Sequence, residues 1–171
     1  MQEGFLQAYV DFFYITTETT PSEIEPSQRL QEEYKLNKRK KGKFQQSEQS
    51  LLQLSDNLVS AESFYREGQT KNCLKQQRIV AEQFEQLNDY ETASYFYKKC
   101  LDISIEAKFV EGEAKAYMGL GICEEKVLNI FNAMGHLETA LQKAIDGNLG
   151  KIEKEISREL VRVYQIIAIQ F

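Results

Sequence analysis

Large and small apolar residues recur at a fixed spacing in the second half of the chain. The pair Val80-Ala81 is followed forty residues later by Leu120-Gly121, and forty residues after that by Leu160-Val161. A second series has the same offset: Ala93, Tyr97 and Cys100, then Ala133, Leu137 and Ala140. An internal period of about 20 to 50 residues indicates stacked units that each bury one face on a neighbour.

Within these units the apolar residues lie three or four positions apart, which predicts amphipathic helices. Asp89 has the side chain of a helix N-cap, and Gly68 is suited to end a helix. Gly147 and Gly150 flank Asn148-Leu149, which we expect to be a stop between two helices. We therefore expect an all-α fold. Its predicted helices cover residues 46–69, 71–87, 90–107, 111–127, 130–146 and 151–171.

The small residues indicate the kind of stack, because two helices approach closely only where the side chains at their crossing are small. The spacing Leu-Gly-x-x-Tyr, then Ala-x-x-x-Phe-x-x-Ala, is matched at Val80, Ala81, Phe84, Ala93, Tyr97 and Cys100, and again at Leu120, Gly121, Ala133, Leu137 and Ala140. The chain thus resembles the tetratricopeptide repeat (TPR) superfamily. This resemblance implies a TPR-type α-solenoid of antiparallel helix pairs, with about two full repeats and flanking half-repeats.

The pattern departs from that family in three ways. The usual tryptophan position holds Gln77, Tyr117 or Ser157, and the usual closing proline is Ile105 or Ile145. The period is forty residues rather than about 34. Either the helices or the loops must therefore be longer, as in the 40-residue subclass of cell-polarity adaptors and several ciliary proteins.

Residues 1–45 form an extension before the predicted repeat domain of residues 46–171. An apolar stripe over residues 1–14 predicts a helix that either lies on the repeats or docks on a partner. Both prolines of the chain fall within residues 15–27, which we expect to be a linker.

A basic run in the same extension consists of Lys38, Arg39, Lys40, Lys41 and Lys43. It is a solvated helix end, a nuclear import signal, or a contact for an acidic surface such as a tubulin tail. No aromatic residues interleave the run, so we do not expect nucleic acid as a partner.

Composition and charge exclude further classes of protein. The 171 residues carry a net charge of −5, and no apolar run reaches the ~18–20 residues of a membrane span, so a membrane partner is not expected. The start, Met1-Gln2-Glu3, lacks the basic region of a signal peptide. Cys73, Cys100 and Cys123 match no zinc or CxxC spacing, and we expect them to be reduced, buried residues of a cytoplasmic protein.

The sequence contains no recognisable catalytic or metal-binding constellation. His136 is the one histidine, and no serine or cysteine pairs recognisably with it. Gly119-Leu120-Gly121 lies inside a predicted helix rather than before one, and Glu124-Glu125 lacks a second group of metal ligands. We therefore expect a protein that is not an enzyme and takes no cofactor or metal.

The family resemblance implies where a partner would bind, because the first helix of each repeat lines a concave groove. The predicted groove positions are Lys75, Arg78, Glu82, Glu85, Lys115, Met118, Ile122, Glu125, Glu155, Arg158, Arg162 and Gln165. Those expected to bind a partner are Lys75, Arg78, Lys115, Met118, Ile122, Arg158 and Arg162. Their basic stripe favours an acidic or amphipathic peptide.

A chaperone-type clamp for a terminal carboxylate is not expected in this groove. Arg78 fits such a clamp, but the positions that need an amide or a basic side chain hold Glu82, Gly119, Glu155 and Glu159. Three carboxylates there would repel the carboxylate that the clamp binds.

Three stretches, residues 87–100, 113–120 and 159–164, resemble tetratricopeptide repeat proteins of motile cilia. This resemblance implies a non-enzymatic axonemal adaptor associated with dynein arms, doublet microtubules or intraflagellar transport. One alternative is a cytoplasmic polarity or signalling adaptor with a peptide in its groove. The other is a regulatory module that self-associates through the apolar face of residues 151–171, which we expect the next helix of a longer array to cover.

Overall fold

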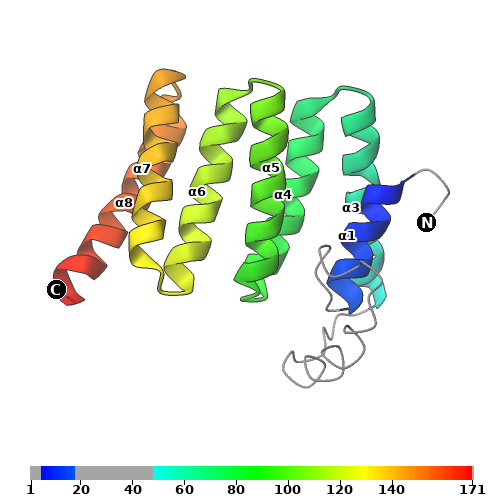
Figure 1. Cartoon of the computed structure of the whole chain (residues 1–171), viewed down its shortest axis with the longest axis horizontal. Helices are drawn as coiled ribbons and strands as arrows, with labels where there is room; N and C mark the ends of the chain where they lie inside the picture. The colour runs from blue at the N-terminus through cyan, green and yellow to red at the C-terminus, as the bar shows by residue number, and fades with distance from the viewer. Residues whose placement is uncertain (1–4, 18–47, 171) are drawn as a thin grey trace, which may run out of the picture.

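A computed structural model describes residues 5–17 and 48–170, and every regular element in these ranges is an α-helix. The helices are α1 (Leu6–Thr17), α3 (Glu48–Arg66), α4 (Thr70–Gln86), α5 (Tyr90–Glu106), α6 (Val110–Lys126), α7 (Ile130–Asp146) and α8 (Gly150–Gln170). From α3 onward, successive helices stand side by side and run in opposite directions (Figure 1). This stack of antiparallel helix pairs is consistent with a helical repeat.

The forty-residue period of the sequence corresponds to a regular backbone unit. The helices from α4 onward begin at residues 70, 90, 110, 130 and 150, and each of α4 to α7 has 17 residues. Three residues connect each helix to the next. The predicted boundaries from residue 71 onward agree with these helices to within one residue. The length beyond the usual repeat therefore lies in the helices, because the connections are short.

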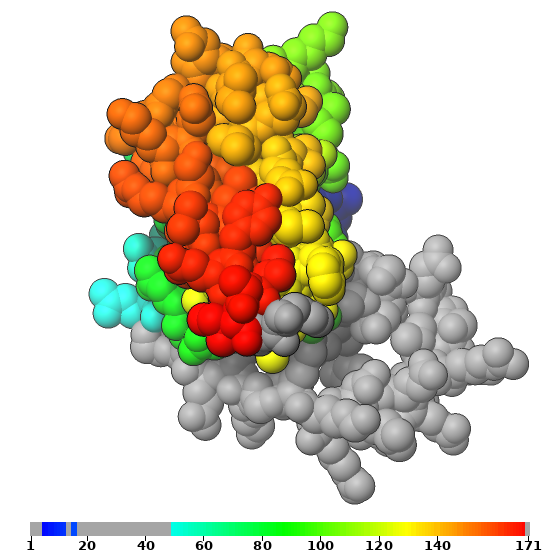
Figure 2. Space-filling view, turned by 90° about the vertical axis from the view of Figure 1, so that its left-hand side faces the viewer, coloured from blue at the N-terminus to red at the C-terminus, as the bar shows by residue number. Residues whose placement is uncertain are grey.

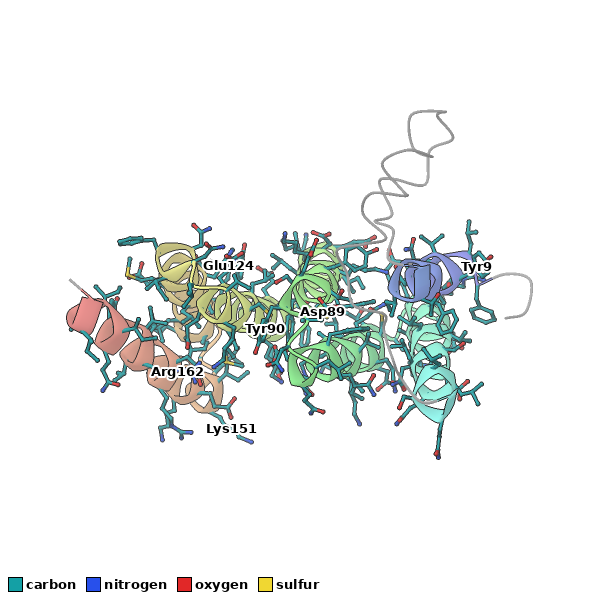
Figure 3. All side chains as sticks on the ribbon, turned by 90° about the horizontal axis from the view of Figure 1, so that it is seen from below. Tyr9, Asp89, Tyr90, Glu124, Lys151 and Arg162 are labelled. Atoms are coloured by element: carbon teal, nitrogen blue, oxygen red, sulfur yellow. The ribbon has the colours of Figure 1, made fainter. Side chains whose placement is uncertain are left out.

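Each three-residue connection uses the same hydrogen-bonding pattern, shown here for the turn after α4. Asn88 adopts a φ of 59°, and its N–H donates to the carbonyl of Glu85 at 2.9 Å. The N–H of Asp89 donates to the carbonyl of Phe84, also at 2.9 Å, which completes a Schellman motif. The Asp89 carboxylate then accepts from the N–H of Thr92 at 3.1 Å, so the predicted N-cap is confirmed (Figure 3).

The left-handed residue of this motif recurs every twenty residues, at Gly68, Asn88, Lys108, Leu128 and Asn148. Gly68 was expected at a helix end, and its φ of 71° confirms that role. Gly147 and Gly150 were expected to flank the stop after α7, and Gly147 is the C-cap of α7 while Gly150 begins α8. The left-handed residue of this turn is not Gly147. Gly147 keeps a φ of −82°, and Asn148 adopts the positive φ instead. Asparagine is the non-glycine residue that most readily takes this conformation, so glycine is not required there.

On one side of the stack, alternate helices contact each other, and on the opposite side they hardly do. Consecutive helices pack on each other; in addition, α4 contacts α6 and α6 contacts α8. Contact among α3, α5 and α7 is at most marginal. The side shared by α4, α6 and α8, called the inner face below, therefore brings together the helices on which the groove positions were predicted.

Helix α1 packs on α3 and is joined to α5 by a buried carboxylate. Asp11 is 1% exposed and accepts hydrogen bonds from Gln7 Nε2 at 3.0 Å and Tyr95 Oη at 2.9 Å. It also forms an ion pair with Lys99. Of the two interpretations of the first apolar stripe, the structure shows a helix that lies on the stack.

The predicted linker begins too early. Ile15 is buried and residues 15–17 continue α1, because the apolar stripe extends one turn further than its aromatic part indicates. The remainder of the linker and the basic run at residues 38–43 lie outside the described residues.

Candidate functional site

A pocket of about 240 Å³ opens between α4, α5 and α6. Three of the predicted partner-binding residues line it: Lys75 and Arg78 from α4, and Lys115 from α6. Two neighbouring helices on the inner face thus place these side chains around one hollow.

The rim of the pocket is basic and its remaining wall is largely apolar. Lys71 joins Lys75, Arg78 and Lys115 on the basic side. The other lining residues are Leu74, Tyr97, Cys100, Phe109, Glu111, Gly112 and Ala116. The pocket therefore presents positive charge directly beside aromatic and aliphatic surface.

Several rim cations have partners within the chain. Arg78 Nε lies 3.1 Å from Glu82 Oε1, but this buried N–H makes no aligned hydrogen bond with a described residue. Lys115 hydrogen-bonds to Glu111, and this bond is the main cause that lowers the pKa of the Glu111 carboxyl. Lys75 forms no ion pair with any residue in the described ranges.

Among the lining residues that the sequence did not predict as binding residues, Lys71 and Phe109 bear most on what the pocket could hold. Lys71 lies one helical turn before Lys75, so the i, i+4 spacing could have revealed it. Its ammonium lies 5.5 Å from the centre of the Phe109 ring. Phe109 belongs to the turn between α5 and α6, and only the geometry of that turn brings its ring to the pocket.

Further along the inner face, polar groups are buried between α4, α5 and α6. Glu85 is half-buried, and burial is the main cause that raises the pKa of its carboxyl, although the hydroxyl of Tyr97 hydrogen-bonds to it. The pKa of Tyr97 is raised by burial first and by Glu85 second. Met118 and Ile122 are half-buried on the same helix as Lys115, which leaves part of each side chain accessible.

At the α8 end of the inner face, Arg162 ties two helices together (Figure 3). Its Nε and Nη2 atoms donate to Glu125 Oε2 of α6 at 3.0 and 2.6 Å, and Nη2 also lies 2.6 Å from Glu159 Oε2. Burial works against the charge, but the hydrogen bonds that Arg162 donates to Glu125, together with the charges of Glu159 and Glu125, raise the pKa of Arg162. Arg158 remains exposed. The predicted basic stripe therefore falls into two parts. Lys75, Arg78 and Lys115 line the pocket, and Arg158 and Arg162 lie on α8.

The residues considered for chemistry take structural positions. Cys73, Cys100 and Cys123 are buried free thiols, as predicted, and burial raises their pKa values to about 11, 12 and 12. His136 stacks on Tyr117 with ring centres 6.1 Å apart.

Within residues 5–17 and 48–170, no three potential metal ligands lie together as a group that could hold an ion. The same ranges hold no helix with the length and apolar character needed to cross a bilayer.

Comparison with known proteins did not place the chain in a family: no family model matches it, and a search of curated proteins found no match.

Proposed function

We propose that this chain is a non-enzymatic protein-interaction module of the tetratricopeptide type, which binds a segment of a partner protein across its inner face. The observation that supports this most directly is the pocket between α4 and α6, which three of the predicted binding residues line. Stacked helix pairs present one continuous surface rather than a closed cavity, which suits an extended or helical segment.

The composition of the inner face favours a peptide over a small metabolite. Met118 and Ile122 offer half-buried apolar surface between the basic pocket and Arg158. Sites for drug-sized ligands usually have about 300–1,000 Å³, and the pocket is smaller than that. A pocket of this size fits one or two side chains of a longer segment.

We further propose that the module is an adaptor of the ciliary axoneme, associated with dynein arms, doublet microtubules or intraflagellar transport. This proposal rests on the resemblance of residues 87–100, 113–120 and 159–164 to tetratricopeptide repeat protein 29 of motile cilia. The basic run at residues 38–43 would suit an acidic tubulin surface. A polarity or signalling adaptor that uses the same face remains the alternative.

The test is a quantitative purification of the tagged full gene product from ciliated cells. A double variant, Met118→Gln with Arg158→Glu, should reduce the recovered partner proteins about tenfold or more, because both changes fall on the inner face. Lys98→Glu on α5 is the control, since it reverses an exposed charge outside the pocket. Equal recovery with both variants would contradict the binding face. Recovery of partners without axonemal proteins would contradict the ciliary role alone.

Self-association is a second candidate function, favoured by the surface at the end of the stack. The expectation that the apolar face of residues 151–171 needs a further helix to cover it is wrong for its central part, because Ile156, Leu160 and Val163 are buried in the same core cluster as residues of α7. Beyond them α7 and α8 lie side by side on the outside (Figure 2), and the exposed apolar residues of α8 are Val161, Tyr164 and Ile169. Light scattering over a range of concentrations measures the mass of the chain in solution. A dimer that Val161→Glu dissociates would support self-association, and a monomer at every concentration would exclude it.

A further inference from the structure

The pocket between α4, α5 and α6 has a charge opposite to that of the whole chain. Four cations and one carboxylate, Glu111, line it, whereas the chain has a net charge of −5. A concentrated charge inside a concave site attracts oppositely charged groups more strongly than scattered surface charges do. The pocket is therefore complementary to an anion.

Two of the rim cations lack a fully formed ion pair with another residue that the structure describes. Lys75 has no ion-pair partner among the residues described, and Arg78 is close to Glu82 without an aligned hydrogen bond. An oxyanion in the pocket could accept from both side chains. Hydrogen bonds in which both groups are charged are the stronger kind.

The apolar wall gives the site a second requirement. Leu74, Phe109 and Ala116 come from α4, from the turn before α6, and from α6 itself, and they lie beside the cations in the same pocket. Leu74 and Ala116 are buried at the base of this wall, and Phe109 is half-buried, so a lone anion would leave mainly the Phe109 ring in contact with water. A bulky apolar group adjacent to the anion would cover that ring and remove apolar surface from water.

We propose that this pocket binds an anionic side chain of a partner peptide together with the bulky apolar side chain next to it. The proposal rests on the proposed function and adds its recognition element. The shared chemistry is an oxyanion, supplied by a glutamate carboxylate or by a phosphorylated serine. Lys75 and Arg78 bind the oxyanion, and Phe109 with Leu74 binds the apolar neighbour.

Four short capped glycine-serine peptides test this with the full chain by isothermal titration calorimetry. Their central pairs are Glu-Leu, Gln-Leu, Glu-Ala and phosphoserine-Leu. The Glu-Leu peptide should bind about tenfold more tightly than Gln-Leu and than Glu-Ala, because each of those lacks one half of the motif. The affinity of phosphoserine-Leu relative to Glu-Leu identifies which oxyanion the pocket prefers.

Matched charge reversals identify the site. Lys75→Glu should weaken the Glu-Leu peptide about tenfold, while Lys98→Glu, an equally exposed lysine on the next helix, should leave it nearly unchanged. Circular dichroism verifies that both variants keep their helices. Equal weakening by both reversals, or equal affinity for Glu-Leu and Gln-Leu, would overturn the proposal. If the peptides fail but Met118→Gln with Arg158→Glu still loses partners, the pocket is wrong and the proposed function stands.

Discussion

Gly119 and Gly121 allow α6 to approach its neighbours more closely than any other residue would. A Cβ atom at Gly119 would lie 2.4 Å from a ring carbon of Tyr97, and one at Gly121 would lie 2.6 Å from Leu137 Cγ and 3.2 Å from the carbonyl of Ala133. These glycines inside a helix therefore serve packing, as their sequence position indicated. Glycines that bind phosphate lie instead in a loop before a helix, which is not where Gly119 and Gly121 lie.

Gly121→Ala should destabilise the chain by about 1–3 kcal/mol, because the new methyl group overlaps the next helix. Gly135→Ala is the matched control, since nothing lies within 4 Å of a Cβ at that exposed position of α7. There the substitution should stabilise by about 0.5–1 kcal/mol through helix propensity. Urea denaturation of both variants measures the difference, and similar effects at the two glycines would contradict the packing argument.

Leu128 is the least suitable of the five left-handed residues. It holds a φ of 66° with 76% of its surface exposed, so it bears the steric cost of that conformation and gains little burial. Leu128→Asn should raise the free energy of unfolding by up to about 1 kcal/mol. The melting temperature of the Leu128→Asn variant should be higher than that of the wild type by about 2–4 °C. The same change at exposed Leu52, inside α3, provides the contrast, since asparagine should lower the stability there.

Glu85 makes stability depend on pH in a specific direction. Burial raises the pKa of its carboxyl above the ordinary 4.5, so the ionised form is disfavoured in the folded chain. Its favourable contribution is complete below pH 4.5 and is lost as the pH rises through the folded pKa. Relative to the wild type, Glu85→Gln should therefore gain stability as the pH increases from 4.5 toward 7. A difference in unfolding free energy that stays constant over this range would contradict the argument.

At the scale of helices, the sequence predicted the repeat elements well because each satisfies a local rule. Apolar spacing located α4 to α8, and Asp89 marked one helix start through its side chain alone. The sequence offered the docking of α1 on the stack as one of two interpretations, but it could not predict the contacts that hold the helix there. The buried pair of Asp11 and Lys99 joins residues 88 positions apart, and no pattern in the sequence links them.

Removing the Asp11 carboxylate should release α1 from the stack. Asp11→Ala leaves the Lys99 ammonium without its partner, and breaking a buried ion pair in this way costs about 3–5 kcal/mol. Amide hydrogen exchange should then accelerate throughout α1 and stay slow in α6 and α7. Gln7→Ala, which removes one hydrogen bond to the same carboxylate, should have a much smaller effect. Unchanged exchange in α1 of the Asp11 variant would show that other contacts hold the helix.

At the scale of the whole molecule, stability should be graded from the middle outward. Each helix packs mainly on its neighbours in the chain: α5 and α6 have a stacked helix on both sides, whereas α8 packs mainly on α7, and α3 is covered beyond α4 only by the shorter α1. Native-state hydrogen exchange should give the highest opening free energies in α5 and α6 and lower values toward α3 and α8. Uniform protection from α3 to α8 would instead indicate one cooperative unit.

The inner face was predictable in its helices but not in its details. The groove positions that the family resemblance implied placed Lys75, Arg78 and Lys115 on one side, and these three residues line a common pocket. The sequence could not show that Glu125 and Glu159 hold Arg162, because that arrangement depends on the distance between α6 and α8. Nor could it place Phe109, whose position depends on the turn before α6.

The short connections between helices also determine how the chain tolerates changes in length. The residue that closes one Schellman motif is also the N-cap of the next helix, so a connection has no spare residue to absorb an insertion. A single inserted residue would rotate every following side chain by about 100° around its helix axis. A block of forty residues, copied between two equivalent turns, restores both the register and the direction of the chain. Tandem duplication of such blocks is thus the route by which this architecture can grow, and deletion of one block is the route by which it can shrink.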